Sequence, residues 1–261
     1  MAPKDSRKLK AKAKPGDGAV ASASKKIKKT TKPRSGITAN WAKSMATQSK
    51  LEELAEAGVL PLQSEIDWRG TEEETRPSLQ EGEVICFLEH VTRGFRPPGH
   101  PFFRDLLRHY GLRVFDLGPN SILNISNYIV LCESYLCTPP SLALFLELFL
   151  CKPQREHKNG PLLVCGGVSI QRRKGSAMPS LELHTHAKHW QKSYFYYKTK
   201  IPAGEHPLPG YSVEPLILNN NMKSFASDTE REAIQPLLKK ISVLVAHGLR
   251  GTDLIKTWMG W

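Results

Sequence analysis

All of the net positive charge of this 261-residue chain lies in its first 50 residues. That segment contains 14 of the 37 Lys and Arg residues but only 2 of the 25 Asp and Glu residues, a net charge of +12. The remainder contains 23 residues of each sign and is neutral. A segment that repels itself and has almost no large apolar side chains cannot form a core. We therefore expect residues 1–48 to be a disordered Lys-rich tail, followed by a folded part.

Residues 51–152 have the apolar spacing of a helical core. The clearest helix is expected over residues 101–110, where apolar side chains recur every three or four positions. His100 would cap this helix, Pro101 suits its first position, and Gly111 would end it in the left-handed conformation. These local signals agree with one another, so they predict this helix more strongly than any other.

Further helices are expected where a capping side chain precedes an apolar stretch. Ser49, Asn120 and Thr138 are candidate N-caps. Residues 83–91 also have helical apolar spacing, and the segment from Ser141 to Cys151 is apolar on nearly every side. A helix without a polar face lies in the centre of a bundle or faces a partner.

Two later segments have the composition of strands. Leu162–Gln171 and Lys192–Lys198 are short and rich in β-branched or aromatic residues, which predicts a small antiparallel β region at 160–200. Residues 201–226 are expected to form a loop or linker. A capping box at Ser227–Glu230 predicts C-terminal helices over 227–261, kinked or interrupted at Pro236. The fold class expected is α+β, predominantly α-helical, with a small antiparallel β extension and a disordered basic N-terminal tail.

The segment His100–Pro140 also carries a resemblance. It contains a Pro-Phe-Phe-Arg opening, a Tyr-Gly helix end, a Pro-Asn-Ser-Ile start, and a Leu-Cys-Glu-Ser-Tyr-Leu stretch before Pro-Pro. These motifs stand at Pro101–Arg104, Tyr110–Gly111, Pro119–Ile122, Leu131–Leu136 and Pro139–Pro140. Together they resemble the plant domain family labelled putative gypsy-type transposon, or transposase-like.

Weaker likenesses to the same family extend the resemblance to residues 49–200 and to the C-terminal motif at Gly248–Trp258. They imply a retrotransposon-derived protein, Gag-like or domesticated, with a shortened C-terminus. No reaction is tied to the family, so the resemblance names a lineage and not a chemistry.

The tail is the main candidate for function. Clustered flexible cations bind phosphates without reading sequence, because binding releases counterions. The stretch KKIKKTTKPR is also similar to a nuclear import signal. A nuclear location is therefore expected, with the cytoplasm as the alternative, and a solvated tail without a dedicated partner also remains possible. The candidate residues are Lys25, Lys26, Lys28, Lys29, Lys32 and Arg34.

Three other features have both a functional and a structural interpretation. Arg172, Arg173 and Lys174 follow a Gly166-Gly167 pair and could form a secondary nucleic-acid contact, although a strand followed by a basic turn is the simpler interpretation. The aromatic run Tyr194–Tyr197 could stack on bases, or it could fill a core. Glu147 could be a perturbed carboxylate, or it could reach solvent or pair with a cation.

No metal site or cofactor is expected. His184 and His186 would share a face of a strand, but no Cys or carboxylate stands at zinc-site spacing. The five cysteines are odd in number and lie within or beside apolar segments, which fits buried thiols in a reduced intracellular compartment. The most apolar stretch, Leu142–Cys151, has ten residues and contains Glu147, whereas a membrane span needs roughly 20. We therefore expect no membrane association.

The chain lacks the short motifs of retroelement proteases, polymerases and zinc knuckles, and no nucleophile–base pair stands out. The leading hypothesis is a non-enzymatic structural or interaction protein whose tail contacts DNA or RNA or directs nuclear import. The alternative is a transposase-like DNA-processing enzyme or its degenerate remnant. Self-association through Leu142–Leu150 is a further possibility.

Overall fold

The computed structural model describes most of the chain after residue 42. Its contacts divide the chain into residues 1–36 and 37–261, and only the second unit contains described residues. The predicted disorder of the tail therefore lies, as far as residue 42, outside the described residues. The described ranges are 43–71, 74–155, 162–163, 165–181, 189–198, 208, 216, 222 and 224–259.

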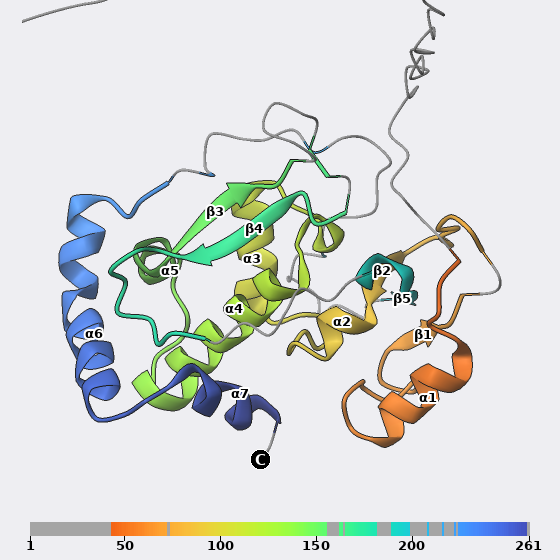
Figure 1. Ribbon diagram of the computed structural model, residues 1–261, viewed down its shortest axis with the longest axis horizontal. Helices are drawn as coiled ribbons and strands as arrows, with labels where there is room; N and C mark the ends of the chain where they lie inside the picture. The colour runs from red at the N-terminus through yellow and green to blue at the C-terminus, as the bar shows by residue number, and fades with distance from the viewer. Residues whose placement is uncertain are drawn as a thin grey trace, which may run out of the picture. The chain divides into compact units, whose positions relative to one another are not determined.

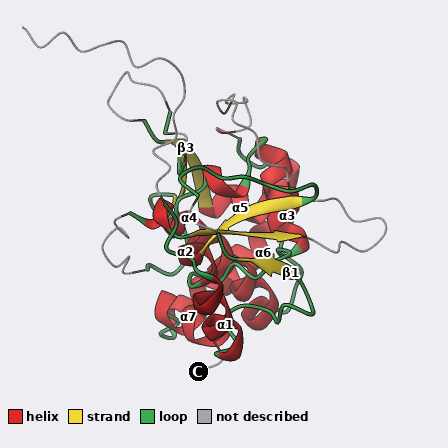
Figure 2. Cartoon of the chain, turned by 90° about the vertical axis from the view of Figure 1, so that its right-hand side faces the viewer, coloured by secondary structure: helices red, strands yellow, loops and turns green. Residues whose placement is uncertain are grey.

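Helices dominate the described part of the chain, and the strands are short (Figure 1, Figure 2). This confirms the predominantly helical α+β fold. The helices are α1 (Gln48–Glu56), α2 (Leu88–Val91), α3 (Pro101–Tyr110), α4 (Pro119–Val130), α5 (Leu142–Leu148), α6 (Asp228–Ala246) and α7 (Gly251–Met259). A π-helical segment, η2 (Leu131–Leu136), extends α4, and two 3-10 turns are η1 (Val114–Asp116) and η3 (Trp190–Lys192).

Among the described residues, five strands form two antiparallel sheets. One has the order β1 (Asp67–Arg69), β5 (Tyr194–Lys198), β2 (Glu83–Phe87), and the other pairs β3 (Phe149–Pro153) with β4 (Val168–Arg172). The two strands predicted at 160–200 thus do not pair with each other. Each pairs with segments from the region expected to be helical, so the β region is part of the core.

Two predicted helices contain a strand. The segment 83–91 forms β2 and then the single turn α2, and the segment 141–151 forms α5 and then β3. A short apolar run does not distinguish a buried strand from a buried helix by its spacing alone. In both cases an antiparallel partner distant in sequence decides the outcome, β5 for β2 and β4 for β3.

The helix caps were predicted correctly where several signals coincide. The His100 side chain accepts a hydrogen bond from the Phe102 N–H at 3.1 Å, and Gly111 ends α3 with a φ of 66°. The capping box of Ser227 and Glu230 also forms, and α6 continues through Pro236 to Ala246.

Three other caps were predicted at the wrong residue. The N-cap of α1 is Thr47 and not Ser49, that of α4 is Gly118 and not Asn120, and that of α5 is Ser141 and not Thr138. Proline favours the first position of a helix, so Pro119 places the cap of α4 at Gly118. Ser141 is held by the Tyr128 hydroxyl, which donates to its carbonyl at 2.7 Å and accepts from its N–H at 3.1 Å.

The folded part begins before residue 49. The Ser44 hydroxyl donates to the carbonyl of Tyr194 at 2.6 Å, and the Met45 N–H donates to the carbonyl of Lys192 at 2.7 Å. Ala46 is fully buried. The end of the predicted tail is thus held against β5 and belongs to the fold.

An ion pair joins the two strands that flank β5. Arg69 in β1 donates from Nε and Nη2 to the two carboxylate oxygens of Glu83 in β2, at 2.7 and 2.9 Å. The guanidinium also lies 4.2 Å from the centre of the Tyr196 ring. Burial alone would raise the pKa of Glu83, but hydrogen bonds from Arg69 and the Gln80 N–H outweigh it and hold that pKa below its usual value.

We predict that Arg69→Ala lowers the free energy of unfolding by about 2 to 3 kcal/mol, because it leaves the buried Glu83 carboxylate without its partner. The control is Lys50→Ala, which removes an exposed pair with Glu53 and should cost less than about 1 kcal/mol. Urea unfolding of both variants measures the difference. Equal losses would show that Arg69 does not hold the sheet together.

Candidate functional site

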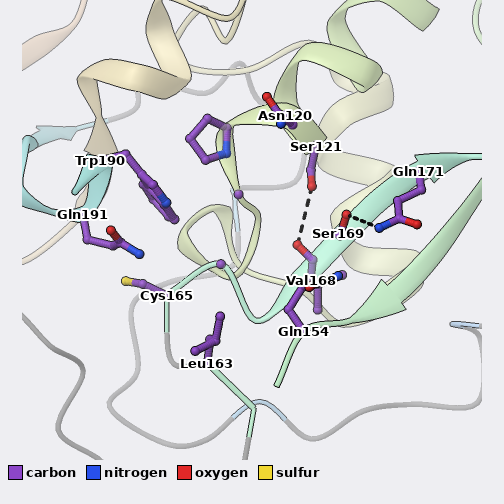
Figure 3. A pocket seen from close by; sticks show the side chains of 13 residues that line it. Asn120, Ser121, Gln154, Leu163, Cys165, Val168, Ser169, Gln171, Trp190 and Gln191 are labelled. Atoms are coloured by element: carbon purple, nitrogen blue, oxygen red, sulfur yellow. Dashed lines mark hydrogen bonds between the residues drawn. The ribbon is translucent and has the colours of Figure 1, made fainter. Parts of the chain in front are cut away.

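A cavity of about 230 Å³ lies where the start of α4 meets β4 and the turn at Trp190. Figure 3 shows Trp190 and Gln191 on one side and Ser169 and Gln171 on the other, with Cys165 and Leu163 below them. The lining residues come from four separate parts of the sequence: Gly118, Pro119, Asn120, Ser121, Gln154, Leu163, Cys165, Gly166, Val168, Ser169, Gln171, Trp190 and Gln191.

Polar side chains of α4 fix the cavity wall to β4. The Ile170 N–H donates to the Ser121 hydroxyl at 3.0 Å, and the Asn124 side-chain amide donates to the Ile170 carbonyl at 2.9 Å. In the described part of the chain, β4 pairs with strand β3 and forms an isolated bridge between Val168 and Leu117, and these two side chains satisfy the backbone groups of Ile170 that face away from β3. Both side chains are buried.

The Gly166-Gly167 pair brings the loop before β4 close to its neighbours. A Cβ on Gly166, whose φ is +73°, would lie 2.9 Å from Cζ2 of Trp190, and one on Gly167 would lie 2.2 Å from the Leu163 carbonyl oxygen. The glycines therefore allow close packing against the Trp190 wall.

The predicted basic contact lies at the other end of β4 from these glycines. Arg172 donates to the Met178 carbonyl at 2.8 Å. Arg173 donates to the carbonyls of Leu146 and Ser224 at 2.7 and 3.0 Å. Both guanidinium groups hold neighbouring loops, whereas Lys174 is exposed. The structure does not bring this group together with the glycines into one phosphate site.

Trp190 is supported from behind by two buried rings. Its ring centre lies 4.7 Å from that of Phe87 in an edge contact, and 5.3 Å from that of His90. His90 donates from Nε2 to the Leu117 carbonyl at 3.1 Å. Burial lowers the pKa of His90 to about 3, so the ring is neutral near pH 7 and adds no charge beside the cavity.

The described lining residues combine apolar and polar side chains and carry no charged one. Within the described part of the chain, the side chains of Asn120, Gln154 and Gln191 have no hydrogen-bond partner, and the Asn120 Oδ1 atom is buried. Gln171 donates to the Ser169 hydroxyl at 3.1 Å. Burial raises the pKa of the Cys165 thiol, which keeps it protonated and unreactive. At neutral pH the described lining thus combines unpaired amide groups with a protonated thiol.

Two structural interpretations from the sequence are confirmed. Glu147 accepts a hydrogen bond from Nε of Arg231 at 3.2 Å, so it pairs with a cation. The aromatic run Tyr194–Tyr197 is fully buried in β5 and offers no surface for stacking on bases. Most of Leu142–Leu150 is also buried within the chain itself.

The remaining candidates are placed as follows. The tail residues Lys25 to Arg34, and His184 and His186, lie outside the described residues. Where side chains are described, no group of three or more His, Cys, Asp or Glu could hold a metal ion. Cys137, which has a φ of 55°, is exposed. The expectation that all five cysteines are buried was therefore wrong for this residue. None of the described helices has the length and apolar character that a membrane span requires.

Comparison with known proteins gives one match. Residues 85–153 match the model of a family described as "putative gypsy type transposon". This part of the chain is therefore similar to a transposon-derived domain family. The match covers the α4 wall of the cavity, while the residues at 154–171 and 190–191 that complete the cavity lie beyond it. No curated protein and no solved structure matches the chain.

We predict that His90 makes the protein less stable in mild acid. The unfolded chain binds a proton at His90 near pH 6.5, whereas the folded chain does so near pH 3, so stability falls as the pH decreases between these values. His90→Gln should remove this contribution, seen as a smaller loss of unfolding free energy from pH 7 to pH 4.5. His247→Gln, at an exposed position, is the control. Parallel pH profiles for wild type and His90→Gln would contradict the assignment.

We also predict that Gly166→Ala destabilises the protein more than Gly175→Ala. Both glycines have a positive φ, and a side chain in that backbone conformation should lower the free energy of unfolding by about 1 kcal/mol. At Gly166 the new Cβ would also clash with Trp190, which should lower the free energy of unfolding by about 1 kcal/mol or more in addition. Thermal or urea unfolding measures both. Equal losses would mean that Trp190 adjusts without cost.

Proposed function

We propose that this transposon-derived protein is a non-enzymatic interaction protein, which contacts DNA or RNA through its basic tail and enters the nucleus by means of the same segment. The observation that supports this best is the separation of charge, with a net +12 in the first 50 residues and none in the rest. Such a segment binds polyanions mainly by releasing counterions, so affinity depends on salt and little on sequence.

The chemistry of the folded part supports a binding role. The titratable groups described inside it serve packing: His90 is neutral, Glu83 is paired with Arg69, and Asp116 is paired with Arg113 at 2.8 Å. Burial raises the pKa values of the Cys86, Cys132, Cys151 and Cys165 thiols. None of these groups is prepared to act as a nucleophile or a general base at neutral pH.

The test keeps the full chain and changes only the charge of the tail. In one variant Lys25, Lys26, Lys28, Lys29, Lys32 and Arg34 become Gln, and in the matched control the lysines become Arg and Arg34 becomes Lys. The Gln variant should bind a DNA duplex more weakly, with the slope of log affinity against log salt reduced by up to about 5. The control should bind as the wild type does.

Substitution is preferable to deletion of the tail, because Ser44 and Ala46 pack in the fold. Unchanged binding by the Gln variant would refute the proposed nucleic-acid contact. A fluorescent fusion tests import: the wild type and control should collect in the nucleus, and the Gln variant should not. Divalent-metal-dependent cleavage or joining of DNA strands by the full chain would instead establish the transposase-like alternative.

A further inference from the structure

The cavity beside Trp190 has the size and chemistry of a site for one small ring system. Its volume of about 230 Å³ is below the range of about 300–1,000 Å³ typical of sites for drug-sized ligands. Leu163, one of its lining residues, is 37% exposed, so the cavity reaches the surface. A ligand of one or two fused rings fits this space better than a peptide or a sugar chain.

The lining defines what the ligand must offer. Asn120, Gln154 and Gln191 each carry a side-chain carbonyl acceptor and an NH₂ donor without a partner in the described structure. None of the described lining residues is Lys, Arg, His, Asp or Glu, so they offer no counter-charge for a phosphate or an ammonium group. The complementary ligand is therefore neutral and carries both donors and acceptors.

Trp190 adds an aromatic wall that is held in place. Its contacts with Phe87 and His90 fix the indole ring, and the absence of a Cβ at Gly166 lets the loop pack directly against it. Proteins recognise single-stranded nucleic acids with this combination of an aromatic ring for the face of a base and amide groups for its edge.

We propose that this cavity binds a single unpaired nucleobase. The base comes either from a strand of RNA or DNA or from a free nucleoside, because the heterocycle is the same. Binding of a base within a strand rests on the proposed function, since the tail would hold the strand. Binding of a free nucleoside does not rest on the proposed function. A base in a duplex is stacked and paired and cannot enter without being extruded. The cavity thus gives the protein a preference for single strands that the tail alone does not have.

The first experiment measures binding of adenosine, guanosine, cytidine and uridine to the full chain by isothermal titration calorimetry. Nucleosides carry no phosphate, so the tail does not contribute. At least one should bind, with an affinity that changes little between 50 mM and 500 mM salt. No binding of any of the four would overturn the proposal.

Two variants locate the site. Gly118→Val fills the cavity from α4. Gly118 has a φ of −77° and its Cβ would meet no atom within 4 Å, so the variant should fold. Trp190→Leu removes the aromatic wall. Each should weaken nucleoside binding about tenfold or more, whereas Phe225→Leu, which removes an exposed aromatic ring outside the cavity, should not. Circular dichroism confirms folding, and unchanged binding by Gly118→Val would refute this location.

The second experiment separates the sources of the base. Single-stranded RNA, single-stranded DNA and an abasic single strand of equal length compete for the full chain at one salt concentration. The abasic strand should bind about tenfold more weakly than a strand with bases, and Gly118→Val should abolish that difference. Equal binding of abasic and normal strands would exclude strands as the source.

The tail variant keeps the two proposals apart. With its six Gln substitutions it should lose most affinity for strands and retain its affinity for nucleosides. If the tail variant binds strands as the wild type does, the proposed function is refuted. The proposal for the cavity is then still decided by whether nucleosides bind. If nucleosides do not bind but the tail variant loses strand binding, only the cavity proposal fails.

Discussion

The fold depends on the pairing of β5 with strands on both of its edges. Its four aromatic residues, Tyr194–Tyr197, are fully buried, which requires cover on both faces as well as on both edges. The N-terminal residues Ser44 to Ala46, strand β1 and strand β2 supply part of that cover. Because the turn η3 leads directly into β5, the same pairing fixes Trp190 and hence one wall of the cavity (Figure 1, Figure 3). Loss of this strand would thus disturb the start of the fold and the candidate site together.

The sequence predicted the features that local chemistry decides. Helix α3 begins at His100 and ends at Gly111, and α6 begins with its capping box, because caps and stops act over a few residues. It did not predict which strands pair. Strand β2 was mistaken for part of a helix since its partner β5 is more than 100 residues away, and only that pairing distinguishes the two conformations. The cavity was not predicted for the same reason, because its residues come from four separate segments of the chain. The nearest signal in the sequence was the Gly166-Gly167 pair.

The charge pattern distinguishes the two parts of the chain. The first 50 residues carry the net charge, and the remainder is neutral. The pairs Arg69–Glu83 and Arg231–Glu147 each join two different helices or strands, and the pair Arg113–Asp116 closes the turn η1. The proposed division is that the tail supplies attraction to a polyanion and the cavity supplies selection of unpaired bases. Salt would then govern the first step and not the second.

The contact between α4 and β4 has a consequence for how copies of the chain can associate. A strand with an open edge is a template for the addition of another strand, and this is a common route to aggregation. Here the N–H and the carbonyl of Ile170 on that edge are already occupied by Ser121 and Asn124, so an incoming strand finds these two groups unavailable. Two polar side chains inside a largely apolar helix thus act as a barrier to β-mediated polymerisation.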